Sequence, residues 1–130
     1  MEKIDIEFVD HTRIKTIIGS REILSDLPAD KGGKGEHPKP LELFLSSLAS
    51  CTGLGLASLL NRKGIDLDEV SLSLEYETDP STGMIPLIRF CLELSEDIDE
   101  KTEKILKNTV AACKIKRVIA AEPRFEVEAE

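Results

Sequence analysis

One long apolar stretch, from Pro40 to Gly64, limits what this chain can fold into. Leucines recur throughout it, and most of its polar residues are small hydroxyls. A proline at the start, the acidic Glu42 in the first turn and a glycine behind two cations are typical helix start and stop signals. The stretch therefore predicts one long helix. A helix that is apolar on nearly every side is usually buried.

To bury the predicted helix on all sides, other residues must pack around it, and a single chain of 130 residues has few to spare. A chain of this length corresponds to one domain, so we predict a single domain over residues 1–130. Either a sheet of the same chain wraps the helix or a second subunit covers it. The sequence leaves both arrangements open.

Alternation of apolar and polar residues predicts strands on both sides of the helix. A glycine-rich segment, residues 29–37, is expected to be a flexible lead into the helix. Asp97 or Asp99 is placed to cap a later helix, whose pattern breaks near Cys113. This order of elements predicts an α+β fold with antiparallel pairing. The predicted strands cover residues 4–9, 13–18, 22–26, 70–77, 88–95 and 124–130.

The net charge of the chain is −8 at pH 7. Affinity for a nucleic-acid duplex comes mainly from cations that neutralise phosphates, so this charge argues against a nucleic-acid partner. Serines, Thr52 and two glycines interrupt the apolar stretch, and we predict no membrane span. The first residues alternate between apolar and acidic side chains, unlike a secretory signal. We therefore expect a cytoplasmic protein.

The three cysteines are widely spaced and do not form the even framework of a disulfide-rich secreted domain. In a reducing compartment they are expected to be thiols at rest. His11 and His37 lack metal-type spacing to any cysteine, and the glycine-rich residues 32–35 lack the Gly-Lys-Ser/Thr ending of a P-loop. We predict neither a metal site nor a bound cofactor.

Cys51 in the long helix and Cys113 in the second half of the chain are the strongest functional signal. Small residues beside Cys51 would let another backbone segment come close, so that the two thiols could meet and one could resolve the other. The nearby cations Lys114, Lys116 and Arg117 favour a lowered pKa of the Cys113 thiol. The alternative is that they form a solvated basic face near a helix end. A packing role stays open, since free cysteine is among the most buried residue types. Cys91 is taken as incidental.

The segment from Pro40 to Cys51 resembles the OsmC/Ohr family. In that family a glycine-containing loop leads to a Pro-x-Glu-Leu helix start. A small-residue stretch then ends in the first cysteine, and a second cysteine lies between two later helices. Here the loop is residues 32–35 and the later cysteine is Cys113. The resemblance extends over essentially the whole chain in the order of its elements.

The resemblance implies an OsmC-like α+β fold in an intertwined homodimer, with antiparallel sheets wrapped around long central helices and sites at the subunit interface. It also implies a thiol peroxidase that counters oxidative stress by reducing organic hydroperoxides. On that basis Cys51 would be oxidised to a sulfenate and Cys113 would close a disulfide with it. A dithiol reductant would then reset the enzyme.

The chain departs from the better-studied peroxidases of the family near the helix start. Leu41 follows Pro40 where they carry an activating glutamate, and Glu42 comes one residue later, which turns its side chain by about 100 degrees. No arginine of the N-terminal strands aligns with their arginine, and Lys114 replaces a proline that commonly follows the second cysteine. The chain is therefore closer to the less characterised OsmC-like branch.

Glu42 is a candidate catalytic residue, with complementation of the helix dipole as the alternative. Along one continuous helix it would lie about 13 Å from Cys51, too far for a hydrogen bond. Only a partner subunit or a break in the helix would bring a glutamate to that thiol.

Two main functions follow from these observations. The first is reduction of organic hydroperoxides by the Cys51/Cys113 pair. The alternative is a non-redox module that binds a small apolar or sulfur-containing molecule in the same interface cleft. A purely structural role would leave both thiols unreactive in the folded protein. Apolar side chains near the helix start favour an organic hydroperoxide over hydrogen peroxide; they are Leu41, Phe44, Leu45 and Leu48.

Overall fold

The computed structural model describes residues 1–129 of the chain. These residues form two compact units, one from Met1 to Ser46 and one from Ser47 onward. The long helix α1, Pro40–Lys63, contributes to both units. Its bounds confirm the helix predicted from residue 40. The prediction of one domain over residues 1–130 stays a prediction.

The first unit contains an antiparallel sheet with the strand order β1-β2-β3. Its strands are β1 (Asp5–Phe8), β2 (Arg13–Ile18) and β3 (Arg21–Asp26). The predicted N-terminal hairpin and the third strand are confirmed. Gly19 joins β2 to β3 with a φ of 62°, a left-handed conformation that glycine adopts without a steric cost.

The predicted flexible lead between β3 and α1 is tied to the end of β3. The N–H of Asp26 donates to the carbonyl of Pro38 at 3.2 Å, and its carboxylate accepts from the N–H of Glu36 at 3.1 Å. A Cβ added to Gly33 would collide with the backbone of Leu27, so the turn needs glycine there. A short 3-10 helix, Ala29–Lys31, lies within the same segment.

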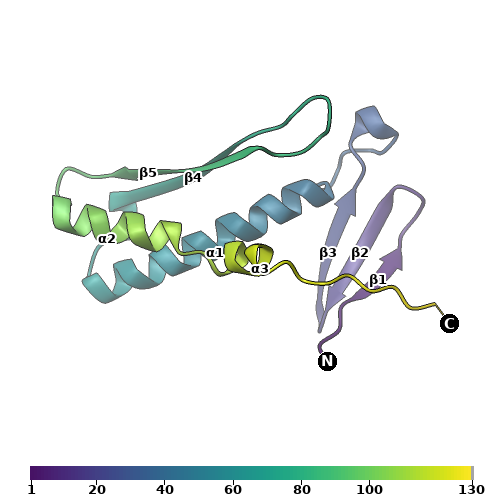
Figure 1. Cartoon of the computed structure of the whole chain (residues 1–130), viewed down its shortest axis with the longest axis horizontal. Helices are drawn as coiled ribbons and strands as arrows, with labels where there is room; N and C mark the ends of the chain where they lie inside the picture. The colour runs from purple at the N-terminus through teal and green to yellow at the C-terminus, as the bar shows by residue number, and fades with distance from the viewer. Residues whose placement is uncertain (130) are drawn as a thin grey trace. The chain divides into compact units, whose positions relative to one another are not determined.

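The second unit contains an antiparallel hairpin and two helices besides its part of α1 (Figure 1). The hairpin strands are β4 (Val70–Glu77) and β5 (Leu87–Leu94), preceded by a short 3-10 helix, Leu67–Glu69. The helices are α2 (Glu100–Ala111) and α3 (Lys114–Ala120). The predicted alternation in the hairpin and the predicted break near Cys113 are both confirmed.

The core of the second unit lies between α1, α2 and one face of the hairpin. Leu106 of α2 is 0% exposed and lies in a cluster of buried aliphatic side chains. Apolar residues on one face of the strands, among them Leu72, Phe90 and Leu92, pack against it. The fold is therefore α+β with antiparallel sheets, as predicted. The buried members of the cluster are Leu56, Leu59, Leu60, Leu106 and Val110.

Helix ends in the second unit follow the signals in the sequence. The carboxylate of Asp99 accepts a hydrogen bond from the N–H of Thr102 at 2.7 Å and so caps the start of α2. This bond lowers the pKa of Asp99, because it favours the charged form. Gly64, with a φ of 68°, follows the last residue of α1.

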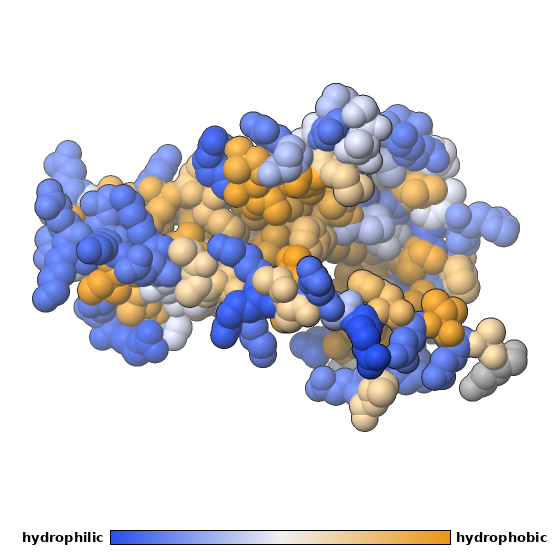
Figure 2. Space-filling model, viewed as in Figure 1, coloured by the Kyte–Doolittle hydropathy of each residue, from blue (hydrophilic) through white to orange (hydrophobic). Residues whose placement is uncertain are grey.

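Part of α1 has no cover within the described chain. Leu54 is 72% exposed, and a Cβ added to Gly53 or Gly55 would meet open space. Figure 2 shows a broad apolar area on the face of the molecule in view. By length and composition α1 would suffice to cross a membrane. Its buried leucines identify it instead as a core helix, which passes the same test.

The predicted C-terminal strand does not form in residues 124–129, which pair with no other strand. Phe125 and Val127 are 94% and 96% exposed, so the alternating pattern finds no partner within the described chain. The last residue of that predicted strand, Glu130, lies outside the described residues.

Candidate active site

Cys51 and Cys113 come together within the second unit. Cys51 lies in the middle of α1, and Cys113 is the residue before the first turn of α3. The side chain of Cys51 lies next to that of Cys113 and contributes to lowering its pKa, and neither cysteine is in a disulfide. Cys51 is half-buried, whereas Cys113 is 2% exposed. The fold thus brings two thiols from distant parts of the sequence into direct contact.

The chain break between α2 and α3 places Cys113 at this point. Helix α2 ends at Ala111, and Cys113 has extended backbone angles with φ −99° and ψ 128° before α3 begins. The ammonium group of Lys116 donates to the carbonyl of Ala111 at 3.0 Å and ties the two helices across the break. The buried sulfur is thereby held at the start of α3.

We expected small residues beside Cys51 to let another backbone segment come close. No such segment lies near Gly53 or Gly55. Neither Gly53 nor Gly55 has any atom within 4 Å of where a Cβ would stand. The contact between the thiols is made by side chains that reach from α1 to the break after α2. The two glycines instead belong to the uncovered part of α1.

The pKa of Cys113 is lowered by its surroundings. Burial alone would raise it, since a charged sulfur loses its hydration in the interior. The backbone N–H groups of Lys116 and Ile115, together with the side chains of Thr52 and Cys51, outweigh that effect by favouring the thiolate. The sequence had suggested lysine ammonium groups as the cause. The leading favourable contributions come from amide, hydroxyl and thiol groups instead.

Thr52 is a member of this site that sequence reasoning missed. Its side chain is 2% exposed, and its hydroxyl lowers the pKa of Cys113. The hydroxyl nevertheless falls short of hydrogen-bond geometry with that sulfur and has no other partner. A signal was present: Thr52 stands four residues from both Leu48 and Leu56, on the helix face that enters the core.

Glu42 lies in the first unit, in the first turn of α1. Its carboxylate accepts a hydrogen bond from the N–H of Lys39 at 3.1 Å, which satisfies a free donor at the helix start. Arg13, in the N-terminal strand β2, forms an ion pair with Asp10. The Oδ2 atom of Asp10 accepts from the Arg13 Nε at 2.9 Å and from the Arg13 Nη2 at 2.8 Å. This pairing places the pKa of Asp10 well below its usual range. A catalytic role for Glu42 stays a prediction.

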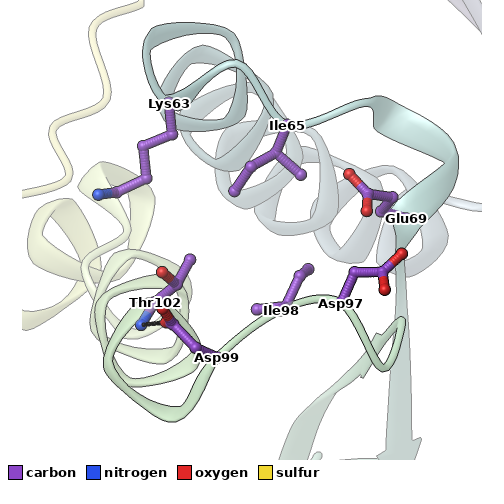
Figure 3. A pocket seen from close by; sticks show the side chains of 7 residues that line it. All are labelled: Lys63, Ile65, Glu69, Asp97, Ile98, Asp99 and Thr102. Carbon is purple, nitrogen blue, oxygen red and sulfur yellow. Dashed lines mark hydrogen bonds between the residues drawn. The ribbon is translucent and has the colours of Figure 1, made fainter.

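A pocket of about 400 Å³ lies elsewhere in the second unit, between the end of α1 and the start of α2 (Figure 3). It contains no thiol, and its Asp99 is already bonded to the backbone of Thr102. Among residues 1–129 no group of three or more metal-binding side chains is arranged to hold an ion. The pocket is lined by Lys63, Ile65, Glu69, Asp97, Ile98, Asp99 and Thr102.

Comparison with known proteins agrees with this arrangement. The sequence model of the OsmC-like protein family matches residues 33–128, which include Cys51, Cys113 and all of α1. This chain belongs to the OsmC-like family. The resemblance seen in the sequence is thereby confirmed.

Similar proteins are found in several bacteria. The uncharacterized protein YmaD of Bacillus subtilis (strain 168) is 23% identical over 111 residues, which are 79% of this chain and 74% of that protein. A Psychrobacter arcticus 273-4 protein assigned to osmotic stress and detoxification is 24% identical, with a TM-score of 0.76 over 91% of this chain and 88% of its own.

A third similar structure is a Vibrio cholerae protein assigned to organic hydroperoxide resistance, with captopril bound in one of its active sites. It is 15% identical, with a TM-score of 0.62 over 94% of this chain and 87% of its own. At these identities the structures show the fold, which is that of OsmC/Ohr proteins.

Proposed function

We propose that this protein is a thiol-dependent peroxidase that reduces organic hydroperoxides through Cys51 and Cys113. The observation that carries the proposal is that the side chains of Cys51 and Cys113 are neighbours within one compact unit, with neither in a disulfide. Membership of the OsmC-like family supports it, as does the likeness to a protein assigned to organic hydroperoxide resistance. The two free thiols also fit a reducing compartment, and we propose the cytoplasm.

The exposure of the two sulfurs suggests their order of reaction. Cys51 is half-buried, so a peroxide can reach it, whereas Cys113 is 2% exposed. The sulfur of Cys51 attacks the terminal oxygen of the hydroperoxide, the O–O bond breaks, and the alcohol leaves with the proton that the thiol gives up. Cys51 is then a sulfenic acid. This order agrees with the roles implied by the family resemblance.

The second step closes the disulfide. The sulfur of Cys113 attacks that of Cys51, an S–S bond forms, and the S–O bond breaks to release hydroxide, which becomes water. An external dithiol then attacks the disulfide through a mixed intermediate and returns both cysteines to thiols. Each cycle converts one hydroperoxide and one dithiol into an alcohol, water and a disulfide.

We further propose that the protein acts as a homodimer. Leu54 and the two neighbouring glycines leave a stripe of α1 without cover, and residues 124–129 have an alternating pattern without a paired strand. A second copy of the chain would cover the helix and offer an edge for the strand. In such a dimer Glu42 of one subunit would act on the thiol pair of the other, which is the catalytic role proposed for it.

The substrate preference follows from the apolar character of α1. Leu41 and Phe44 lie in the first half of that helix with part of their side chains accessible, whereas Leu45 is buried. An organic hydroperoxide presents an apolar body that hydrogen peroxide lacks. Turnover of cumene hydroperoxide and of hydrogen peroxide, measured side by side with dithiothreitol, tests this. We expect faster turnover of the organic substrate. Equal rates would reject the preference, and absent rates would reject the peroxidase.

A second candidate is a non-redox module that binds a small molecule at the same place. The captopril found in an active site of the Vibrio cholerae protein favours this alternative. Intact mass measured after dilute peroxide separates the two. A binding module would hold its ligand without losing two hydrogens per chain, and its affinity would survive replacement of both cysteines by serine.

A further inference from the structure

Thr109 and Thr52, both in helices of the second unit, differ in whether their hydroxyls form a hydrogen bond. Thr109 in α2 donates to the carbonyl of Ile105 at 3.0 Å, the usual arrangement for a helical threonine. Thr52 in α1 is 2% exposed, and its hydroxyl has no hydrogen-bond partner. A buried hydroxyl without a partner is costly, so its position calls for an explanation.

The surroundings of Thr52 supply that explanation. The hydroxyl lies against the sulfur of Cys113 and favours the charged form of that thiol. Helix α1 thus presents two consecutive side chains to Cys113, the thiol of Cys51 and the hydroxyl of Thr52. Both can donate a hydrogen bond to a negatively charged sulfur. The Thr52 hydroxyl has no other partner that would compete for such a bond.

We infer that Thr52 is a positioning residue of the thiol pair. Its buried hydroxyl donates to the sulfur of Cys113 and holds that thiol as the thiolate that closes the disulfide with Cys51. The inference rests on the proposed peroxidase function and adds a third residue to its second step. A thiolate, not a thiol, is the nucleophile in that step.

Few titratable or charged side chains of the described residues lie around the sulfur of Cys113. From α1 the titratable group that faces it is Cys51. On its own helix, α3, the ammonium group of Lys116 is bonded to the carbonyl of Ala111, and Lys114 is exposed. Because solvent screens exposed charges, the uncharged donors beside the sulfur are expected to decide its protonation. Removing one of them should have a measurable effect.

The test compares Thr52→Val, which removes the hydroxyl and keeps the shape, with Thr52→Ser, which keeps the hydroxyl. Thr109→Val is the matched control, because its hydroxyl is bonded to the backbone carbonyl of Ile105. Cumene hydroperoxide oxidises each protein in rapid mixing. Dimedone trapping then reports sulfenic acid, and non-reducing peptide mapping reports the disulfide. Circular dichroism and thermal melts establish that each variant is folded.

We expect Thr52→Val to form the sulfenic acid as fast as the unmodified protein at neutral pH. Its disulfide should close more slowly by a factor on the order of ten, the effect of losing one hydrogen bond to a charged group. The difference should vanish above the ordinary thiol pKa of about 8.5, where Cys113 is a thiolate in either protein. Thr52→Ser should restore the rate, and Thr109→Val should leave it unchanged.

A direct titration tests Thr52 independently of any activity. In a background with Cys51→Ser and Cys91→Ser, thiolate absorbance at 240 nm reports Cys113 alone. Thr52→Val should move its titration to higher pH, and Thr52→Ser should not. An unchanged titration and an unchanged closure rate in Thr52→Val would overturn the inference while leaving the peroxidase proposal intact. Absence of any sulfenic acid or disulfide in the unmodified protein would overturn the peroxidase proposal, and the titration would still decide the role of Thr52.

Discussion

The side chain of Cys51 lies next to the sulfur of Cys113, although the two cysteines lie in different halves of the chain. One comes from the middle of a continuous helix and the other from a break between two helices. Burial, the backbone N–H groups of α3 and the Thr52 hydroxyl all act on the second sulfur. The pair therefore combines a reachable thiol with a buried one that readily carries charge.

The free energy of unfolding is expected to depend on pH because the thiol of Cys113 titrates at a lower pH in the folded protein. Its pKa in the folded protein is lowered, so the thiolate stabilises the fold fully above the ordinary thiol pKa of about 8.5. This stabilisation is lost as the pH falls through the folded pKa. Denaturant unfolding of the unmodified protein and of Cys113→Ser, measured between pH 6 and 9 under reducing conditions, checks the sign. Cys91→Ser is the control. A difference between the unmodified protein and Cys113→Ser that shrinks as the pH rises would contradict the assigned direction.

The core of the second unit should be sensitive to truncation of Leu106. This side chain is 0% exposed and lies among leucines of α1 and residues of the hairpin. Leu106→Ala should lower the free energy of unfolding by about 2–5 kcal/mol, because it removes buried methyl groups and leaves a cavity. Asn108→Ala, at an exposed position of the same helix, should change it by less than about 0.5 kcal/mol. Similar losses in the two variants would show that α2 is not packed as described.

The proposed dimer should depend on the uncovered stripe of α1. Leu54→Arg places a charge where a second copy is expected to pack, so sedimentation velocity should detect a shift toward monomer. Leu67→Arg is the matched control, since this leucine is 67% exposed but lies in the short 3-10 helix before β4. A dimer that survives Leu54→Arg, or a chain that is monomeric without any substitution, would rule out this interface.

Much of the fold follows from local patterns in the sequence. Alternation located β4 and β5 because one face of each strand packs against the core and the other lies toward solvent. The same pattern located β1, although all four of its residues are exposed. Proline and glycine marked the ends of α1, and Asp99 marked the start of α2. The same alternation predicted a strand over residues 124–130. The described residues of that segment are unpaired, since a strand also needs a free edge beside it.

The site was only partly predictable for a related reason. Cysteine identity and family resemblance pointed to Cys51 and Cys113, but the causes of the lowered pKa depend on which groups surround the buried sulfur. Backbone N–H groups carry no sequence signature, so Lys116 was noticed for its ammonium group and not for its amide. Thr52 looked like one of several small polar residues in α1. Only its burial and its missing hydrogen-bond partner distinguish it.

The proposed peroxidase mechanism requires that Cys51 and Cys113 form a disulfide with each other. The reduced protein is treated with one equivalent of cumene hydroperoxide, alkylated under denaturing conditions and digested without reductant for mass spectrometry. We predict the loss of two hydrogens per chain and one linked peptide pair that contains Cys51 and Cys113, with Cys91 alkylated. Recovery of Cys51 and Cys113 as alkylated thiols, or a disulfide that involves Cys91, would contradict the proposed mechanism.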